Sequence, residues 1–411
     1  ETVRQYGAEK LVQADELETV RRRHLDFFMA LAETMQPMFT KSEQLVWLAR
    51  AQTELDNMRL AMQWALELGE PELGLRIISA MFRYWYKNMH GKEIVERQTS
   101  LADVSISGAL PPTLHYARSF YTAGTLANHY DPTLARHLFE QCIEISRPLA
   151  FDEGMAWSQA WIGYIDTSRR DPATREWFEL SLAHCRRIED PWRQAWVMGR
   201  ALVCYARYES VMGCDAAAEA LVAQCGAEMG KIDGDRLCIG HGRTLLGTIA
   251  IRRGQFELAR ELLLEGQEHY RAVESMVEVA NNLVAQGFLA LRVGTPAQSM
   301  VLFRQSLQIA STYPMSPDTT RGIAQVMIAA AACRHWHSAA RLAGHLEGAE
   351  RADNDLRSGT AELVGITLKA HTQAIDAARS ALGDSTFEDE ILAGRTMNRD
   401  EAIQFALQGS A

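Results

Sequence analysis

The sequence has no long hydrophobic run and no basic start followed by an apolar segment. A helix that crosses a bilayer needs about 20 apolar residues, so the sequence predicts neither a membrane span nor an export signal. Cysteine is also sparse, with seven residues in the whole sequence. Their number is odd and none are spaced C-x-x-C. In a chain of this size they indicate reduced, mostly buried thiols, and we expect a cytoplasmic protein with no membrane partner.

The sequence also lacks the common motifs of catalysis. No G-x-x-x-x-G-K-[ST], G-x-S-x-G or H-E-x-x-H occurs in it. The stretch CRHWH places Cys333 and His337 one turn apart on one predicted helix face, with His335 pointing away, which does not meet zinc geometry. We expect no enzyme activity, no cofactor and no metal. Scattered Ser, Cys and His side chains leave an enzyme open as a reserve interpretation.

Basic residues are outnumbered, with 42 Lys and Arg against 52 Asp and Glu, which gives a formal charge of −10. Without a long basic run, such a chain is poorly suited to binding a phosphate backbone, and we expect no direct binding of nucleic acid. Hydrophobic residues make up 47% and prolines number only 11, as in a folded protein. A length of 411 residues exceeds one ordinary core, so we expect several domains or a repeat array.

What the sequence does contain is helical periodicity that repeats. Apolar residues recur at spacings of three and four, and short Gly- or Pro-containing breaks separate the helical segments. Residues 247–263 and 287–303 share a starting Gly, a second Gly seven residues later and an Ala soon after it. The same frame accepts 124–139 and 163–178 and, with small adjustments, 206–221 and 328–343.

This repeat of about 40 residues is typical of tetratricopeptide-like helix–turn–helix units. The small residue in the first helix of each unit lets the second helix approach closely, and the Ala in the second helix lets the next hairpin stack. Because a single hairpin cannot bury its apolar face alone, we expect an all-α helical-repeat superhelix with a concave side and helical caps at both ends.

Both ends of the sequence resemble one family. Residues 1–11 (ETVRQYGAEKL), 21–33, 54–67 and 378–407 are similar to the region that follows the nucleotide-binding and winged-helix parts of bacterial STAND-class regulatory ATPases, the LuxR-type and AfsR-type transcriptional regulators. The resemblance implies a sensor arm that receives an inducer or a partner protein and releases an ATPase switch. It also implies that the ATPase and DNA-binding domains of the parent chain lie outside this sequence, which begins with Glu.

The same reasoning divides the chain into four parts. We expect residues 1–69 to join a missing ATPase or winged-helix part, 70–110 to form a first divergent hairpin, 111–353 to form the repeats, and 354–411 to form capping helices.

The repeat register predicts which side chains line the concave groove. Counting the key small residue as the eighth position, the second, fifth, ninth and twelfth positions of each first helix are expected to face the groove. They combine aromatic rings with arginines and hydroxyls, which are typical of small-molecule and peptide sites, and Arg200 and Arg207 could hold a carboxylate or phosphate. Packing between repeats is the alternative. The predicted ligand-binding residues are Tyr84, Arg118, Tyr121, Trp157, Tyr164, Trp196, Arg200, Arg207, His241, Thr244, Asn281 and Phe288.

The aromatic stretch MFRYWYKNMHG, residues 81–91, is divided by the same argument. Phe82, Trp85, Tyr86 and Met89 fall on one face of a helix and are expected to pack against neighbouring helices. Tyr84 lies on the opposite face of the helix, and its side chain is expected to face the groove.

Two functions agree with these patterns. The first is a regulatory sensor arm that binds a small molecule or a partner protein in the groove. The second is a general scaffold for peptides or proteins without a small-molecule ligand. A closed, aromatic pocket favours the first, and an open, wet groove favours the second.

Overall fold

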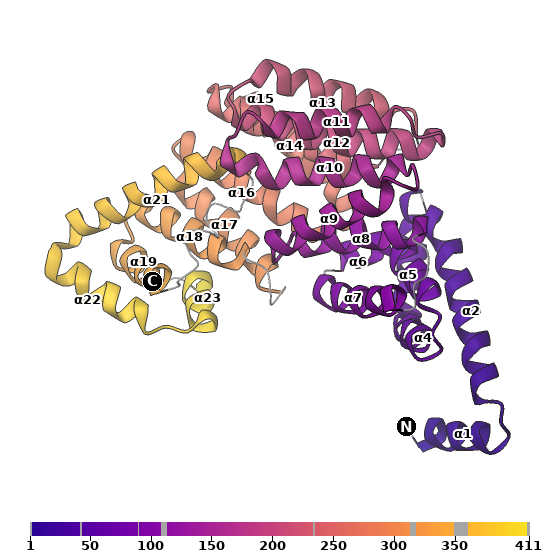
Figure 1. Ribbon diagram of the computed structural model, residues 1–411. Helices are drawn as coiled ribbons and strands as arrows, with labels where there is room; N and C mark the ends of the chain where they lie inside the picture. Colours follow the sequence, from indigo (N-terminus) through magenta and orange to yellow (C-terminus); the bar gives the residue numbers. More distant parts are fainter. Residues whose placement is uncertain are drawn as a thin grey trace. The chain divides into compact units, whose positions relative to one another are not determined.

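The computed structural model describes residues 2–41, 43–88, 90–107, 113–232, 235–312, 318–348 and 361–408. Every regular element in these ranges is a helix, which confirms the all-α prediction (Figure 1). No helix among them is both long and apolar enough to cross a membrane. Contacts divide the chain into two compact units, residues 1–162 with 180–197 (unit 1) and residues 163–179 with 198–411 (unit 2).

Unit 1 is built from short helices that pack pairwise along the chain. The contacts join α4 with α5, α7 with α8, and α8 with α9, while α2 packs on both α4 and α5. Its helices are α1 Thr2–Gln13, α2 Leu17–Met35, η1 Gln36–Thr40, α3 Gln44–Thr53, α4 Leu55–Glu67, α5 Pro71–Ala80, α6 Phe82–Lys87, α7 Gly91–Ser107, α8 Leu114–Ala127, α9 Pro132–Ser146 and most of α10 Asp152–Asp166.

Unit 2 continues the same hairpin pattern and ends in additional helices. In sequence order, α14 packs on α15, α16 on α17 and α18 on α19, and then α21, α22 and α23 contact these last hairpins, as expected of caps. The remaining helices are η2 Thr167–Arg169, α11 Thr174–Cys185, α12 Pro191–Val211, α13 Asp215–Met229, α14 Arg236–Arg252, α15 Phe256–Ala272, α16 Met276–Arg292, α17 Pro296–Ser311, α18 Asp318–Ala332, α19 Trp336–Gly348, α21 Ala361–Leu382, α22 Asp384–Arg395 and α23 Arg399–Gln408.

The glycine that recurs in the first helix is a close-packing position, as the repeat predicts. A methyl group built on Gly287 would lie 2.2 Å from the Phe303 ring, so only a hydrogen leaves room for that ring. The same arrangement recurs with a large side chain 15 or 16 residues downstream, in the pairs Gly124–Phe139 (2.8 Å), Gly163–Phe178 (2.7 Å) and Gly247–Leu263 (2.8 Å). The hairpin register read from the sequence is therefore confirmed at these four positions.

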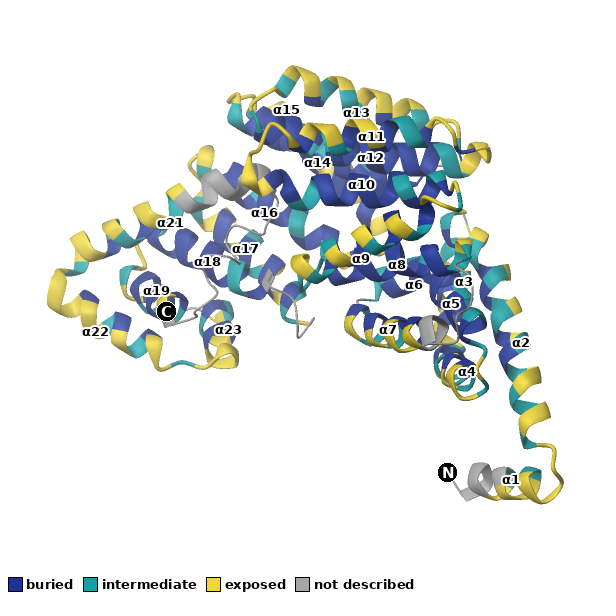
Figure 2. Cartoon of the chain, in the orientation of Figure 1, coloured by how far each residue is buried: buried dark blue, intermediate teal, exposed yellow. Residues whose placement is uncertain are grey.

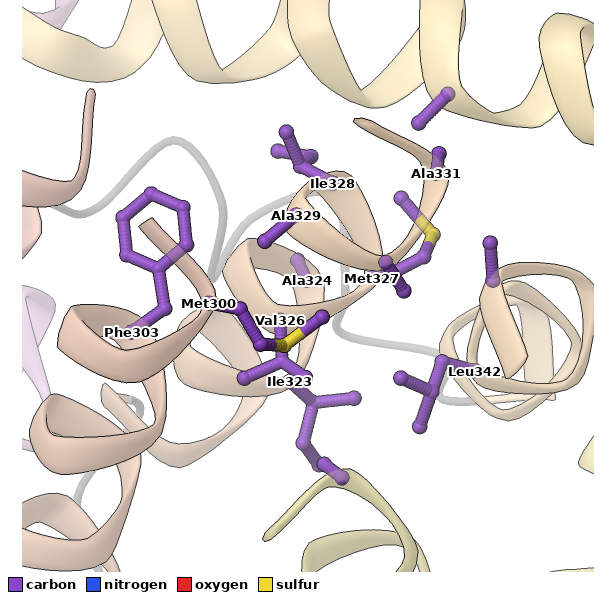
Figure 3. Packing of buried hydrophobic residues seen from close by; sticks show 14 of the residues in the cluster. Met300, Phe303, Ile323, Ala324, Val326, Met327, Ile328, Ala329, Ala331 and Leu342 are labelled. Carbon is purple, nitrogen blue, oxygen red and sulfur yellow. The ribbon is translucent and has the colours of Figure 1, made fainter. Parts of the chain in front are cut away.

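Burial alternates between the two helices of a hairpin. Figure 2 shows α14 largely dark blue, whereas the outer face of α15 is exposed, and the side chains of Leu258 and Leu264 on α15 remain about half exposed. The main hydrophobic core of unit 2 joins α14–α19 with α21–α23. In Figure 3, Met300 and Phe303 of α17 pack beside Ile323, Val326 and other buried residues of the Ala-rich helix α18.

The CRHWH stretch is not one helical face, so that part of the sequence interpretation is wrong. Helix α18 ends at Ala332 and α19 begins at Trp336. Between them Arg334 adopts the left-handed conformation with φ 64°. Cys333 and His337 therefore lie on either side of a turn, and Nδ1 of His337 lies 3.0 Å from the carboxylate of Glu390.

Candidate functional site

Unit 1 contains a pocket of about 410 Å³ that has aromatic walls. This volume is within the range of small-molecule sites. Its lining comes from η1, α5, α6, α8 and the first turns of α12, so five separate elements meet around it. The side chains used below are Thr40, Lys41, Phe82, Arg83, Tyr121, Asp190, Trp192, Arg193 and Trp196.

The aromatic wall is a stack of three tryptophans. Trp196 lies 4.6 Å from Trp157 and 5.8 Å from Trp192, centroid to centroid, with both pairs of rings close to parallel. Trp157 is buried and its indole N–H donates to the hydroxyl of Thr125 at 2.9 Å. Phe82 meets Trp196 edge-on at 6.4 Å. Trp192, at the end of this stack, lines the pocket and is 37% exposed.

Behind the wall, one buried carboxylate organises the polar side chains. Glu153 is 4% exposed and accepts hydrogen bonds from Arg118 at 3.0 Å, from Nη1 of Arg193 at 3.0 and 3.1 Å, and from the Tyr121 hydroxyl at 2.8 Å. Burial by itself would raise the pKa of Glu153, but the two guanidinium groups outweigh it and hold this pKa below its usual value. Burial, with Glu153 nearby, raises the pKa of Tyr121 well above its ordinary value.

The pocket carries more positive than negative charge. Lys41, Arg83 and Arg193 line it, against one carboxylate at the lining, Asp190. Asp190 accepts a hydrogen bond from the backbone N–H of Arg193 at 2.7 Å and so caps the start of α12. The guanidinium of Arg83 lies over the Trp196 ring, 5.7 Å from its centroid.

The structure brings four of the five predicted groove residues of unit 1 together here. Tyr121 and Trp196 line the pocket, Trp157 supports Trp196, and Arg118 binds the same carboxylate as Tyr121.

Tyr84 is placed differently from the sequence interpretation. It is 1% exposed, and its hydroxyl donates to Gln52 at 2.7 Å. Phe82 packs against the rings of Trp157 and Trp196, as expected, and it also lines the pocket. Trp85 is fully buried, as expected, and Met89 lies outside the described residues. The expected division of residues 81–91 is therefore corrected at Tyr84.

In unit 2 the predicted residues form a separate buried polar cluster. Arg200 donates through Nη1 to Nδ1 of His241 at 3.1 Å, and Nε2 of His241 lies 3.2 Å from the carboxylate of Glu278. Because an arginine can only donate, Nδ1 must be the acceptor, and the proton of a neutral His241 is on Nε2. Burial, reinforced by Arg200 and Arg207, lowers the pKa of His241. Glu278 is buried too, and His241 and Arg207 keep its pKa low against burial.

The other predicted residues of unit 2 divide between this cluster and the core. Thr244 accepts from Asn282 at 2.9 Å and pairs with the Tyr270 hydroxyl at 3.2 Å, while Asn281 donates to Glu278 at 3.3 Å. Arg207 reaches the Tyr164 hydroxyl at 3.5 Å and lies over its ring. Phe288 is 1% exposed and packs on Phe303, so it belongs to the hydrophobic core.

Sequence reasoning missed Lys41, Arg83, Trp192, Arg193 and Glu153. A signal for two of them is present in PWRQAW, residues 191–196, where Trp192 precedes Trp196 by one helical turn and Arg193 lies beside it. Lys41 and Arg83 reach the pocket from parts of the chain without the repeat pattern. Glu153 stands at the second residue of α10 and shows no local signal.

The lowered pKa of His241 predicts a pH dependence of stability. Its pKa is lowered in the folded chain, whereas an unfolded histidine titrates near about 6.5, so below that pH the unfolded chain binds more protons. The free energy of unfolding should therefore fall as pH drops from 7.5 to 5.5. In His241→Gln, whose amide can replace both hydrogen bonds, this decline should be shallower by up to about 1.4 kcal/mol per pH unit.

Urea denaturation at several pH values would measure this difference. The other histidines whose pKa burial lowers, such as His24 and His115, contribute equally to both proteins and cancel in the comparison. Parallel pH profiles would show that His241 carries a proton in the folded chain.

Comparison with known proteins adds a partial match. Three relatives share 38% identity over 94 residues, which is 23% of this chain and 10% of each relative. They carry the provisional name of HTH-type transcriptional regulators and come from Mycobacterium bovis and two strains of Mycobacterium tuberculosis. The chain is a helical-repeat protein with partial similarity to mycobacterial regulators. The match spans only about a tenth of the length of those relatives. No protein-family model matches the chain.

Two solved structures are similar at the level of helical architecture. A Rap protein complexed with competence and sporulation factor is 12% identical, with a TM-score of 0.43 over 81% of this chain and 99% of that chain. A circular tandem repeat protein with a novel repeat topology is 14% identical, with a TM-score of 0.23 over 95% of this chain and 98% of that chain.

Proposed function

We propose that this helical-repeat chain is the effector-sensing arm of a bacterial STAND-type transcriptional regulator, and that the pocket of unit 1 receives a small-molecule effector. The partial match to mycobacterial regulators and the family resemblance of both ends support the regulatory role. The attached ATPase and DNA-binding domains would belong to the parent chain, in the cytoplasm. The observation that carries the proposal is the pocket itself, in which aromatic walls and arginines converge from five elements.

A ligand in this pocket would favour one arrangement of the elements that line it. A ligand shifts a conformational equilibrium only by its differential affinity for two states. A ligand that contacts η1, α6 and α12 at once would bind more tightly to the state in which these elements lie close together. Helix α12 starts in unit 1 and continues into unit 2, so its first turns are well placed to pass on the effect of binding.

A binding role without catalysis agrees with the chemistry of the pocket. The carboxylate of Glu153 is held ionised by Arg118 and Arg193, so it is unsuited to act as a general acid. The pocket volume favours a small molecule over a long peptide, and the peptide scaffold is the alternative that the experiment tests.

The test is a screen of metabolite mixtures by affinity selection and mass spectrometry. Thr40→Trp should fill the pocket from its edge, and Trp192→Ala should remove its open aromatic face. We expect a compound that binds the unaltered chain to lose at least tenfold in affinity in both variants. Thr34→Trp, at an exposed position of α2 that does not line the pocket, is the matched control and should bind normally.

Binding that survives both pocket variants would overturn the proposal. A screen in which only peptides bind, with the same sensitivity to Thr40→Trp, would replace it with the scaffold function.

A further inference from the structure

The pocket of unit 1 also indicates which class of effector it accepts. Resting on the function proposed above, we infer that the ligand is a small aromatic anion, a planar ring system that carries a carboxylate or a phosphate group. The inference joins two observations, the open tryptophan face and the excess of cationic side chains around it.

The ring of the ligand is assigned from the tryptophan stack. Trp192 is 37% exposed although its neighbours Trp196 and Trp157 are buried, so it ends the stack with a face open to the pocket. The rings of Trp192 and Trp196 are nearly parallel, with an interplanar angle of 19°. A ligand ring that stacks on Trp192 would lie nearly parallel to both. A planar aromatic ligand would extend this stack, since aromatic rings prefer offset stacking at centroid distances of about 4.5–7 Å.

The sign of the ligand charge follows from the pocket lining. Stacked tryptophans can also attract cations, so a cationic ligand is the competing possibility. At the lining, Lys41, Arg83 and Arg193 are the cationic residues and Asp190 is the anionic one. Behind them the single carboxylate of Glu153 is shared by Arg118 and Arg193, so these two guanidinium groups together keep one positive charge in excess. A cationic ligand would be repelled, whereas an anion would meet an excess of positive charge in a chain whose formal charge is −10.

Arg193 is the best-placed partner for the anionic group. Both of its contacts to Glu153 use Nη1, and an arginine carries three further N–H donors on Nε and Nη2. Its backbone N–H is bound to Asp190 and its Nη1 to Glu153, so the side chain is anchored at both ends. An oxyanion bound there would need little reordering of the arginine, which lowers the cost of binding.

Isothermal titration calorimetry of the full chain with defined probes tests this inference. We expect 2-naphthoate or 2-naphthyl phosphate to bind at least tenfold more tightly than the neutral isostere 2-naphthamide, and more tightly than cyclohexanecarboxylate. The two anions distinguish a carboxylate site from a phosphate site. Arg83→Gln should weaken binding of the preferred anion about tenfold and leave 2-naphthamide unchanged. Arg50→Gln, an exposed arginine on α3 paired with Glu54, is the matched control.

The outcomes separate this inference from the proposed function. If 2-naphthamide binds as well as both anions, or Arg83→Gln changes all affinities equally, the anionic class is wrong. A second outcome is that no aromatic probe binds, but a non-aromatic metabolite binds and loses affinity in Thr40→Trp. The inferred ligand class would then be wrong, and the proposed sensor pocket would still be supported. If Thr40→Trp weakens the binding of no compound, both the ligand class and the sensor pocket are wrong.

Discussion

Replacing Glu153 with Ala is expected to lower the free energy of unfolding of unit 1 by about 3–5 kcal/mol. The substitution removes the one carboxylate that accepts hydrogen bonds from Arg118, Arg193 and Tyr121. Arg118 is mostly buried, so its charge would be left in a low-dielectric site without the anion that faces it. The loss of an ion-pair partner in such a place is far more costly than the same loss at the surface.

The conservative variant Glu153→Gln separates charge from shape. Its amide oxygen can still accept from the Tyr121 hydroxyl, but the negative charge between Arg118 and Arg193 is gone. We expect it to lie between the unaltered chain and Glu153→Ala. Urea denaturation followed by circular dichroism, with hydrogen exchange of α8 and α10, would measure both variants.

An exposed ion pair provides the control. Glu257 pairs with Arg260 on the surface of α15, where the Glu257 side chain is 79% exposed. Glu257→Ala should cost less than about 1 kcal/mol, as surface pairs do. A loss for Glu153→Ala as small as that of Glu257→Ala would mean that the buried network contributes no more than a surface contact.

The sequence predicts the fold well because the hairpin has a steric requirement that is visible at single positions. A hydrogen is needed where the second helix places a large side chain, and Gly124, Gly163, Gly247 and Gly287 meet that need at regular intervals. Once these glycines are aligned, continuous helices fix the direction of every neighbouring side chain. The approach of Arg200 on α12 to His241 on α14 follows from that register.

The register fails where helices are interrupted. Helix α5 ends at Ala80 and the short helix α6 starts at Phe82. Because the helix is interrupted at Met81, the side-chain directions extrapolated from the later hairpins no longer apply to α6. This break explains why Phe82 rather than Tyr84 lines the pocket. The ninth position also faces the second helix in some repeats, which is why Phe288 packs on Phe303.

The polar organisation of the pocket was beyond sequence reasoning for a different reason. Glu153, Arg118 and Arg193 are distant in the chain, and Glu153 has the ordinary appearance of a helical surface residue. Only the packing of α8, α10 and α12 turns them into a buried network. Long-range pairs of this kind have no periodic pattern in the sequence. The aromatic residues Tyr121, Trp157 and Trp196 do follow the repeat register, so the sequence predicts them but not the carboxylate of Glu153.

The second large effect is expected at Gly394, where α22 crosses α19. A methyl group built on Gly394 would lie 1.9 Å from the backbone carbonyl oxygen of Arg341, and one built on Gly344 would lie 2.1 Å from that of Ile391. Backbone atoms cannot rotate away as a side chain can, so the two helices would have to separate. We expect Gly394→Ala to lower the free energy of unfolding of unit 2 by about 3 kcal/mol, the upper end of the usual range for overpacking.

The close crossing also predicts how two substitutions combine. Gly344→Ala should be similarly costly, but the double variant should lose less than the sum, because helices already moved apart by one methyl group leave room for the other. Gly226→Ala is the matched control, since no atom outside its own helix lies within 4 Å of the added methyl group. In the last turn of α13 it should be neutral or stabilise the chain by up to about 0.5–1 kcal/mol, the value for a helix interior. Urea denaturation, with hydrogen exchange of α19 and α22, would compare these four variants with the unaltered chain. Fully additive losses, or a neutral Gly394→Ala, would show that α19 and α22 are not held together at this crossing.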